Sequence, residues 1–316
     1  MNNKPNAPSR ILLVGGFAFF VAAASAPARE KPAKPNVLFI AIDDLNDWTG
    51  TLGGYQGVRT PNLDRLAKRA MTFTRAYCAA PACNPSRAAL MTGKRPANTG
   101  VYLNSQPWRP ALPDAVTLSQ HFMQSGYFAA GGGKIFHGRF KEPESWNLYF
   151  TRPQDPLPTK RPVNGIPKTA HFDWGPVKQN DEAMGDWKVA DWAIKQLQRK
   201  RDKPLFLAAG VFRPHLPWYV PAKYFDDYPL DKIQLPKVKA DDLSDVPLAG
   251  RRMARPEGDH KKVVKSKNWE KAVQGYLASI TFADKCVGRI LDALENSDHA
   301  DDTIIVLWSD HGWHLG

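Results

Sequence analysis

The sequence predicts an α/β fold with a mostly parallel central sheet flanked by helices. Its 316 residues are enough for one large α/β domain or two small ones, and 43% of them are hydrophobic, which is ordinary for a protein with a packed core. Apolar runs of strand length alternate with amphipathic helical segments. The runs are continuously apolar, which is typical of strands buried on both faces of a parallel sheet.

The first residues predict an export signal. Residues 1–26 combine a polar, basic start, an apolar run over 11–24 and a small-residue cleavage pattern at 24–26. The apolar run is too short to span a membrane, although an uncleaved amino-terminal anchor is the alternative. Residues 27–35 predict a tether rich in Pro, Lys and Ala, and 36–316 one catalytic domain. We therefore expect a periplasmic, secreted or lumenal protein without a membrane span after cleavage.

The formal net charge of the chain is +12. A basic surface can attract nucleic acid or an acidic polysaccharide. Export argues against nucleic acid and favours an anionic ester such as a sulfated glycan. The charge could also serve solubility alone.

Three cysteines, Cys78, Cys83 and Cys286, are present. In an exported protein an odd count leaves at least one thiol outside any intramolecular disulfide. Cys78 and Cys286 could pair or remain free. The spacing contains no zinc-type cysteine cluster.

The first predicted strand, 36–42, ends in Asp43 and Asp44. Two adjacent carboxylates repel each other strongly unless a cation lies between them. Neighbouring side chains of a strand point in opposite directions, so the backbone must turn here if both are to face one ion. The alternative is a helix or turn cap.

A helix is predicted over 60–70, with Thr60 as N-cap and Pro61 in the first position. Residues 71–77 alternate like a strand that leads toward Cys83.

Cys83 is predicted to begin a second helix, because Pro85 suits a first turn and Gly93 suits the left-handed end. Free N–H groups and the helix dipole favour an anion beside Cys83, and Arg87 lies one turn later. A buried thiol that merely starts a helix is the alternative.

The next helix is predicted over 118–124 and the next strand over 127–130, followed by Gly131–Gly133. These glycines allow close backbone approach. Lys134 could bind an anion's oxygen and His137 could shuttle protons, unless they are a solvated lysine and a core histidine.

Two long segments, 139–180 and 226–268, are predicted to be loop-rich surface excursions that shape substrate choice. The second ends in a basic run that is either a substrate-facing rim or a mobile, solvated loop. Helical periodicity predicts amphipathic helices over 181–201 and 269–294.

Two more apolar strands are predicted at 204–212 and 303–308. The first is followed by His215 between prolines, and the second by Asp310 and His311. Ligands of open α/β sheets bind outside the carboxyl ends of the strands, so these residues are expected to share one crevice with Asp43, Asp44 and Lys134.

The pattern Cys-x-Pro-Ser-Arg at 83–87, with Leu-x-Thr-Gly-Lys at 90–94, resembles the core motif of the type I sulfatases. The similarity extends from Asp43 to His311, and is strongest to iduronate-2-sulfatase-like and choline-sulfatase-like members. It implies an alkaline-phosphatase-like fold and a sulfuric ester hydrolase. It also implies that a formylglycine-generating enzyme oxidises Cys83 to formylglycine.

The resemblance implies that Asp43, Asp44, Asp310, His311 and the oxygen of modified Cys83 hold one cation. Carboxylates are hard ligands that suit Ca²⁺, or less favourably Mg²⁺, whereas a thiolate suits neither.

The resemblance also implies catalytic roles. Arg87 would stabilise the formylglycine hydrate as an alkoxide, and Lys134 would neutralise the sulfuryl oxygens. His215 would protonate the leaving alcohol, and His137 would deprotonate the second hydroxyl.

Sulfatases of this kind continue beyond the position of Gly316 with a smaller subdomain and a second lysine. We therefore expect an incomplete domain that is poorly soluble or weakly active. The alternatives are a phosphoester hydrolase of the alkaline-phosphatase superfamily, against which the Cys83 motif argues, and a truncated, non-catalytic binder of sulfated glycans.

Overall fold

The computed structural model describes residues 1, 34–167, 169, 171–255 and 257–316. The predicted signal peptide, 1–26, and most of the predicted tether, 27–35, lie outside the described residues.

A five-stranded, fully parallel sheet forms the centre of the described domain. Its order is β3-β2-β5-β1-β7, so the two most apolar strands, β1 and β5, lie inside it. The strands are β1 (Asn36–Ile42), β2 (Phe128–Gly133), β3 (Leu148–Phe150), β5 (Leu205–Val211) and β7 (Thr303–Ser309). A separate two-stranded parallel sheet contains β4 (Trp174–Val177) and β6 (Trp218–Pro221).

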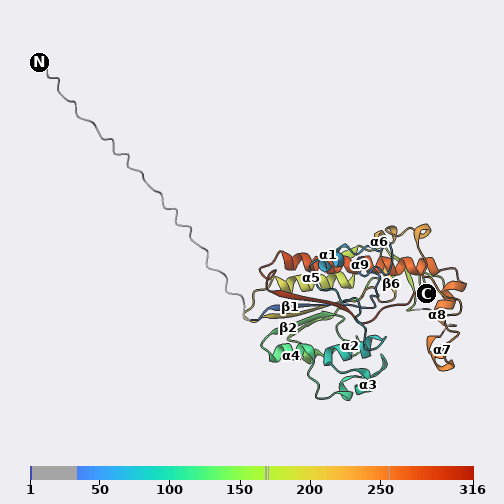
Figure 1. Cartoon of the computed structure of the whole chain (residues 1–316), viewed down its shortest axis with the longest axis horizontal. Helices are drawn as coiled ribbons and strands as arrows, with labels where there is room; N and C mark the ends of the chain where they lie inside the picture. Colours follow the sequence, from blue (N-terminus) through green and yellow to red (C-terminus); the bar gives the residue numbers. More distant parts are fainter. Residues whose placement is uncertain (2–33, 168, 170, 256) are drawn as a thin grey trace. The chain divides into compact units, whose positions relative to one another are not determined.

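Helices cover both faces of the main sheet, which confirms the predicted fold class (Figure 1). Alternate side chains of β1 enter two different hydrophobic cores: Leu38 and Ile40 lie in one, Val37 and Phe39 in the other. The first core lies under α1 (Pro61–Ala67), α5 (Gly185–Leu197) and α9 (Trp269–Glu295), and the second under α2 (Cys83–Thr92) and α4 (Leu118–Gln124). Burial on both faces explains the unbroken apolar sequence of β1.

The long helix α9 carries the apolar stripe that its periodicity predicts. The apolar residues at helical spacing are all buried: Val273, Tyr276, Leu277, Ile280, Ala283, Val287, Ile290, Leu291 and Leu294. Helix α4 begins with a capping box in which Thr117 and Gln120 satisfy each other's backbone N–H groups.

The start of α1 differs from the sequence prediction. Thr60 occupies the N-cap position, but its side chain accepts no hydrogen bond from the first-turn amides. Those amides are capped from α9, where Asp284 accepts hydrogen bonds from the N–H groups of Asn62 and Leu63. The helix is thus tied to its neighbour across the sequence as well as packed against it.

The prediction of a strand over 71–77 is wrong. The segment is irregular, and Met71, Phe73 and Tyr77 are exposed. Alternation alone cannot make a strand, because a strand needs a neighbour to satisfy its backbone N–H and C=O groups.

The two predicted excursions are more ordered than expected. Residues 139–180 contain β3, which extends the main sheet, and β4. Residues 226–268 contain α7 (Leu248–Ala254) and α8 (Asp259–Lys265). The remaining short elements are α3 (Pro96–Thr99), α6 (Ala222–Asp226), η1 (Arg109–Ala111), η2 (Pro143–Ser145), η3 (Asp181–Ala183) and η4 (Leu230–Lys232).

Cys78 is an exposed free thiol and Cys286 a buried one, so the two do not pair. Among the described residues, we find no helix with the length and apolar character that crossing a membrane requires.

Candidate active site

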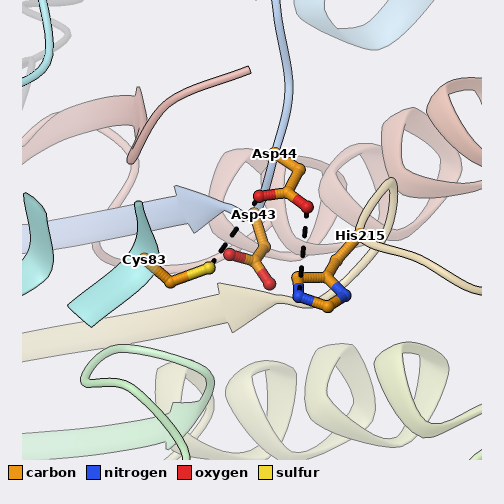
Figure 2. A group of neighbouring side chains, drawn as sticks. All are labelled: Asp43, Asp44, Cys83 and His215. Atoms are coloured by element: carbon orange, nitrogen blue, oxygen red, sulfur yellow. Dashed lines mark hydrogen bonds and ion pairs between the residues drawn. The ribbon is translucent and has the colours of Figure 1, made fainter. Parts of the chain in front are cut away.

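The carboxyl ends of four parallel strands deliver the predicted site residues to one place. Asp43 and Asp44 follow β1, Lys134 follows β2, and Asp310 follows β7. The loop after β5 carries His215, which lies beside Asp43, Asp44 and Cys83 (Figure 2). The structure therefore brings these predicted residues together at one edge of the sheet.

Close packing of two strands sets the position of Lys134. Gly133 has a φ of 84°, and a Cβ there would lie 2.0 Å from the carbonyl oxygen of Gly210. Only glycine allows β2 to turn this close to β5. The next residue, Lys134, is thereby directed at the carboxylate of Asp43, with which it forms a buried ion pair.

The backbone turns at Asp44, as the adjacent carboxylates predict. Asp44 has a φ of 61°, in the left-handed region that few residues other than glycine adopt. The turn is held by two hydrogen bonds. Asp44 N–H donates to Asp310 Oδ1 at 3.0 Å, and Tyr276 O–H donates to the Asp44 carbonyl at 2.7 Å.

Cys83 is the first residue of α2, and the helix ends at Gly93 with a φ of 69°, as predicted. The thiol is buried. Its Sγ lies 3.4 Å from Lys134 Nζ, 3.4 Å from His311 Nε2 and 3.9 Å from Asp44 Oδ1. Burial and then the charge of Asp43 raise the pKa of Cys83 to about 12, so the unmodified thiol is neutral at ordinary pH.

Two overlapping groups of potential ligand atoms meet around Cys83. Asp43, Asp44, Cys83 and His215 form one, and Asp44, Cys83, Asp310 and His311 form the other. Within each group the ligand atoms lie within 4.8 Å of one another. All five residues predicted as metal ligands belong to one or both groups. His215 also belongs to the first group, although the sequence analysis expected it at the leaving alcohol and not among the metal ligands.

The charges of this centre fit a divalent cation. Three carboxylates, Asp43, Asp44 and Asp310, face the two fixed cations Arg87 and Lys134. Burial, followed by the charges of Asp43 and Asp310, raises the pKa of Asp44 to about 8. A carboxyl group that keeps its proton near neutral pH lacks enough positive charge beside it. Ca²⁺ or Mg²⁺ could supply that charge, because both bind carboxylate oxygens.

The negative charge of Asp43 is already balanced by nearby positive charges. Burial raises the pKa of Asp43, but the charges of Lys134 and Arg87 outweigh burial and bring it down to about 2.

The side chain of Arg87 makes its hydrogen bonds with two carboxylates and the end of β2. Its side chain is completely buried and donates to Asp310 Oδ2 at 2.8 Å and to Asp43 Oδ1 at 2.9 Å. It also donates to the carbonyl oxygens of Lys134 and Ile135. Its guanidinium thus joins two carboxylates to the end of β2, and its charge also acts on Cys83. The planar fork of arginine suits this bridging position.

A cavity of about 300 Å³ adjoins Lys134, His137 and His215. Every ionisable side chain on its wall is basic or phenolic: Lys134, His137, Lys141, Tyr149, Arg152 and His215. Burial and the charge of Lys134 lower the pKa of His137 to about 4, and lower the pKa of His215 as well. Both imidazoles are therefore neutral near pH 7.

His137 Nδ1 is buried and makes no hydrogen bond within the described part of the chain. A larger cavity of about 650 Å³ lies between Arg109, Gln120 and Glu144, and none of the predicted site residues lines it.

Sequence reasoning missed a second set of charged residues behind the cavity. Asp186, in the first turn of α5, accepts the backbone N–H groups of Phe212 and Arg213 and pairs with Arg152. Asp155 pairs with both Arg152 and Arg213. The only sequence signal was an acidic residue at the start of a helix, which is too common to identify such a network.

Sequence reasoning also missed Trp313. Its indole Nε1 donates a hydrogen bond to Asp44 Oδ2 at 2.8 Å. The proximity of Trp313 to His311 in the sequence was the only signal.

The fold of the chain is similar to that of several solved structures. A solved 2-O GAG sulfatase covers 89% of this chain with a TM-score of 0.65 at 23% identity, and the chain covers 59% of it. A phosphonate monoester hydrolase from Silicibacter pomeroyi covers 90% of this chain with a TM-score of 0.71 at 22% identity, and 63% of it is covered. At these identities the likeness concerns the fold.

The family follows from the sequence comparison. The family model described as Sulfatase matches residues 35–316, and the chain belongs to the Sulfatase family. A sulfatase of Formosa agariphila is 41% identical over 308 residues, which are 90% of this chain and 60% of the relative. Human iduronate 2-sulfatase is 32% identical over 89% of this chain and 55% of the relative. The chain thus spans somewhat more than half the length of these relatives. The predicted sulfatase resemblance is confirmed.

Proposed function

We propose that this protein hydrolyses sulfate esters, with a divalent cation and an oxidised residue 83 at its centre. The convergence of Asp43, Asp44, Asp310 and His311 on Cys83 is the observation that carries the proposal. The Sulfatase family match and the names of the relatives support the reaction class.

The cation is proposed to be Ca²⁺, with Mg²⁺ as the less favoured ion, because most of the donors are hard oxygens. When bound, it supplies positive charge beside the nucleophile and the sulfuryl group. Asp43, Asp44, Asp310 and His311 would hold it, together with residue 83.

Residue 83 is proposed to be formylglycine, made by a formylglycine-generating enzyme. Its hydrate supplies an oxygen nucleophile, and a second hydroxyl through which sulfate can be expelled as the aldehyde re-forms. The high pKa of the Cys83 thiol supports this, because a neutral thiol is neither a strong nucleophile nor a suitable ligand for a hard cation.

Lys134 is proposed to bind the sulfuryl oxygens as charge develops on them. Its ammonium lies 3.4 Å from Cys83 Sγ. Burial alone would lower the pKa of Lys134, but nearby negative charge, that of Asp43 first, outweighs burial and raises the pKa overall. It therefore stays charged throughout the physiological range. Arg87 is proposed to orient Asp43 and Asp310, since both carboxylates occupy its guanidinium.

His215 and His137 are proposed as the proton-transfer groups. His215 Nδ1 lies 2.5 Å from the carbonyl oxygen of Leu216, so this nitrogen carries the proton and donates the hydrogen bond. His215 Nε2 is then an acceptor on the side of Asp44, at 3.9 Å from Asp44 Oδ2. His137 lines the same cavity, and its Nδ1 has no hydrogen-bond partner among the residues that the structure describes. We propose that His215 Nε2 accepts the proton released as the attacking hydroxyl of residue 83 forms its bond to sulfur, and then passes that proton to the leaving alcohol. His137, also neutral, would accept the proton of the second hydroxyl as sulfate is expelled.

The substrate is proposed to be a sulfated glycan or another sulfated organic molecule. The basic wall of the cavity and the net charge of +12 favour an anionic substrate. The relatives include an iduronate 2-sulfatase and an ulvan-active sulfatase. Export through residues 1–26 is proposed as well, since sulfated polysaccharides are extracellular materials.

The alternative is hydrolysis of a phosphorus ester, which the phosphonate monoester hydrolases of similar fold support. The test compares the kcat/KM values for a sulfate ester, 4-nitrophenyl sulfate, and a phosphonate monoester, 4-nitrophenyl phenylphosphonate, with Ca²⁺ present. Higher efficiency on the sulfate supports the proposal, and higher efficiency on the phosphonate contradicts it. Binding of a sulfated glycan without any hydrolysis, with formylglycine present, would identify a non-catalytic binder.

A further inference from the structure

The two carboxylate oxygens of Asp44 have different surroundings. Oδ2 accepts the 2.8 Å hydrogen bond from the indole of Trp313. Oδ1 faces the other side of the centre, at 3.2 Å from His311 Nε2 and 3.9 Å from Cys83 Sγ. The indole thus holds Oδ2 by one hydrogen bond, while Oδ1 lies nearer His311 and Cys83.

Within the described residues, the indole is the only recorded hydrogen-bond donor to Asp44 Oδ2. The nearest alternative, His215 Nε2, lies 3.9 Å away, which is too long for a hydrogen bond. Asp43 and Asp310 are oriented differently, because Arg87 and Lys134 hold them with full positive charges. Trp313, in contrast, supplies a neutral donor. The negative charge of ionised Asp44 therefore stays uncompensated and can attract a cation.

One series of hydrogen bonds, which we call the brace, runs through Tyr276 and Asn46 and holds the backbones of Asp44 and Trp313. Tyr276 O–H donates to the Asp44 carbonyl, and the Tyr276 oxygen accepts the Asn46 N–H at 3.0 Å. The side chain of Asn46 then donates to the Trp313 carbonyl at 3.0 Å. Residues from the β1 loop, from α9 and from the segment after β7 therefore fix the Trp313–Asp44 pair in one arrangement.

We propose that Trp313 is a positioning residue for the cation: it fixes Asp44 Oδ2, so that Asp44 presents Oδ1 alone as a ligand. Partners that orient a ligand from outside the coordination shell typically change metal affinity by 10–100-fold. The inference rests on the cation site of the proposed function.

The test is Ca²⁺ titration of purified protein by calorimetry, with Trp313→Phe as the variant. Phenylalanine keeps an aromatic ring beside Trp218, which Trp313 meets edge-on at 6.4 Å, and removes the N–H donor together with part of the ring. We expect Ca²⁺ binding to weaken by roughly 10–100-fold. The melting temperature without Ca²⁺ should change little, while its increase on adding Ca²⁺ shrinks. A purely structural role would instead lower the melting temperature of the metal-free protein.

The matched control is Trp174→Phe. Trp174 belongs to the same aromatic cluster, 5.9 Å from Trp218, and its indole N–H is buried without a partner in the described residues. This variant should bind Ca²⁺ as the parent protein does.

Equal Ca²⁺ affinity of Trp313→Phe and the parent protein would overturn the role of Trp313 and leave the cation site intact. Failure of the parent protein to bind either Ca²⁺ or Mg²⁺ would overturn the cation site and this inference together. If Trp313→Phe does not fold, judged by circular dichroism, Asn46→Ala takes its place. It releases the Trp313 carbonyl while keeping the indole, and unchanged Ca²⁺ affinity in that variant would contradict the brace.

Discussion

At the scale of single residues, the centre is a small array of buried charges whose balance depends on Arg87. Its guanidinium links the ends of β1, β2 and β7 through Asp43, the Lys134 carbonyl and Asp310. Removing one partner of a buried ion pair leaves an uncompensated charge, which typically costs 3–5 kcal/mol.

We therefore predict that Arg87→Met lowers the free energy of unfolding by about 3–5 kcal/mol. Urea denaturation measures it. The control is Arg65→Met, which removes exposed ion pairs to Asp292 and Glu295 and should cost less than about 1 kcal/mol. Equal, small costs in both variants would contradict the role given to Arg87.

Asp44 makes cation binding depend on pH. Its folded pKa of about 8 lies above the ordinary value of 3.8, so the proton on Asp44 stabilises the metal-free fold at low pH. This contribution is fully present below about pH 4 and is lost as the pH rises through 8. A cation must displace the same proton.

We predict that Ca²⁺ affinity rises by up to about tenfold per pH unit between pH 6 and 8 and then levels off. Calorimetry in buffers of different ionisation enthalpy would also detect the released proton. An affinity that is constant over this range would show that Asp44 is already ionised.

At the scale of the elements, two buried aspartates tie helices to distant parts of the chain. Asp284 of α9 caps α1, a task that local sequence assigned to Thr60. Residues 222 positions apart form this cap, so no local pattern could have predicted it.

We predict that Asp284→Ala lowers the free energy of unfolding by about 1–2 kcal/mol, as loss of an N-cap does. Catalytic constants should be unchanged, because the cap lies outside the ligand groups. Asp292→Ala, on the exposed side of the same helix, is the control and should cost less than about 0.5 kcal/mol.

Asp186 of α5 holds the segment that leads to His215. It accepts the N–H groups of Phe212 at 2.9 Å and Arg213 at 2.8 Å. We predict that Asp186→Asn lowers kcat for an aryl sulfate by about 10–100-fold, the cost of displacing a catalytic group slightly. If Asp186 acts through His215, the change should add little to His215→Ala in a double-mutant cycle. Full additivity of the two losses would refute this connection.

At the scale of the whole domain, the parallel sheet brings together residues that are far apart in the sequence. The ends of β1, β5 and β7 could be predicted because each strand is a mainly apolar run followed by polar residues, whereas β2 continues through the glycines to Gly133. Since all these strands are parallel, their carboxyl ends meet at one edge, and the predicted site followed from that rule.

What could not be predicted depends on partners that the local sequence does not contain. Residues 71–77 alternate like a strand but lack a neighbouring strand, whereas β3 was overlooked in a segment rich in Pro, Trp and Asn. The sequence places Arg87 on a helix, but it does not show that the guanidinium bonds to the ends of three strands. Trp313 and Asp186 act through single hydrogen bonds, which leave no periodic pattern.

The central claim is that residue 83 acts as formylglycine rather than as cysteine. Its most direct test is mass spectrometry of the peptide containing residue 83, taken from protein that hydrolyses an aryl sulfate. We predict that the active protein carries formylglycine at this position, in proportion to its activity. A fully active protein with an unmodified Cys83 thiol would contradict the account.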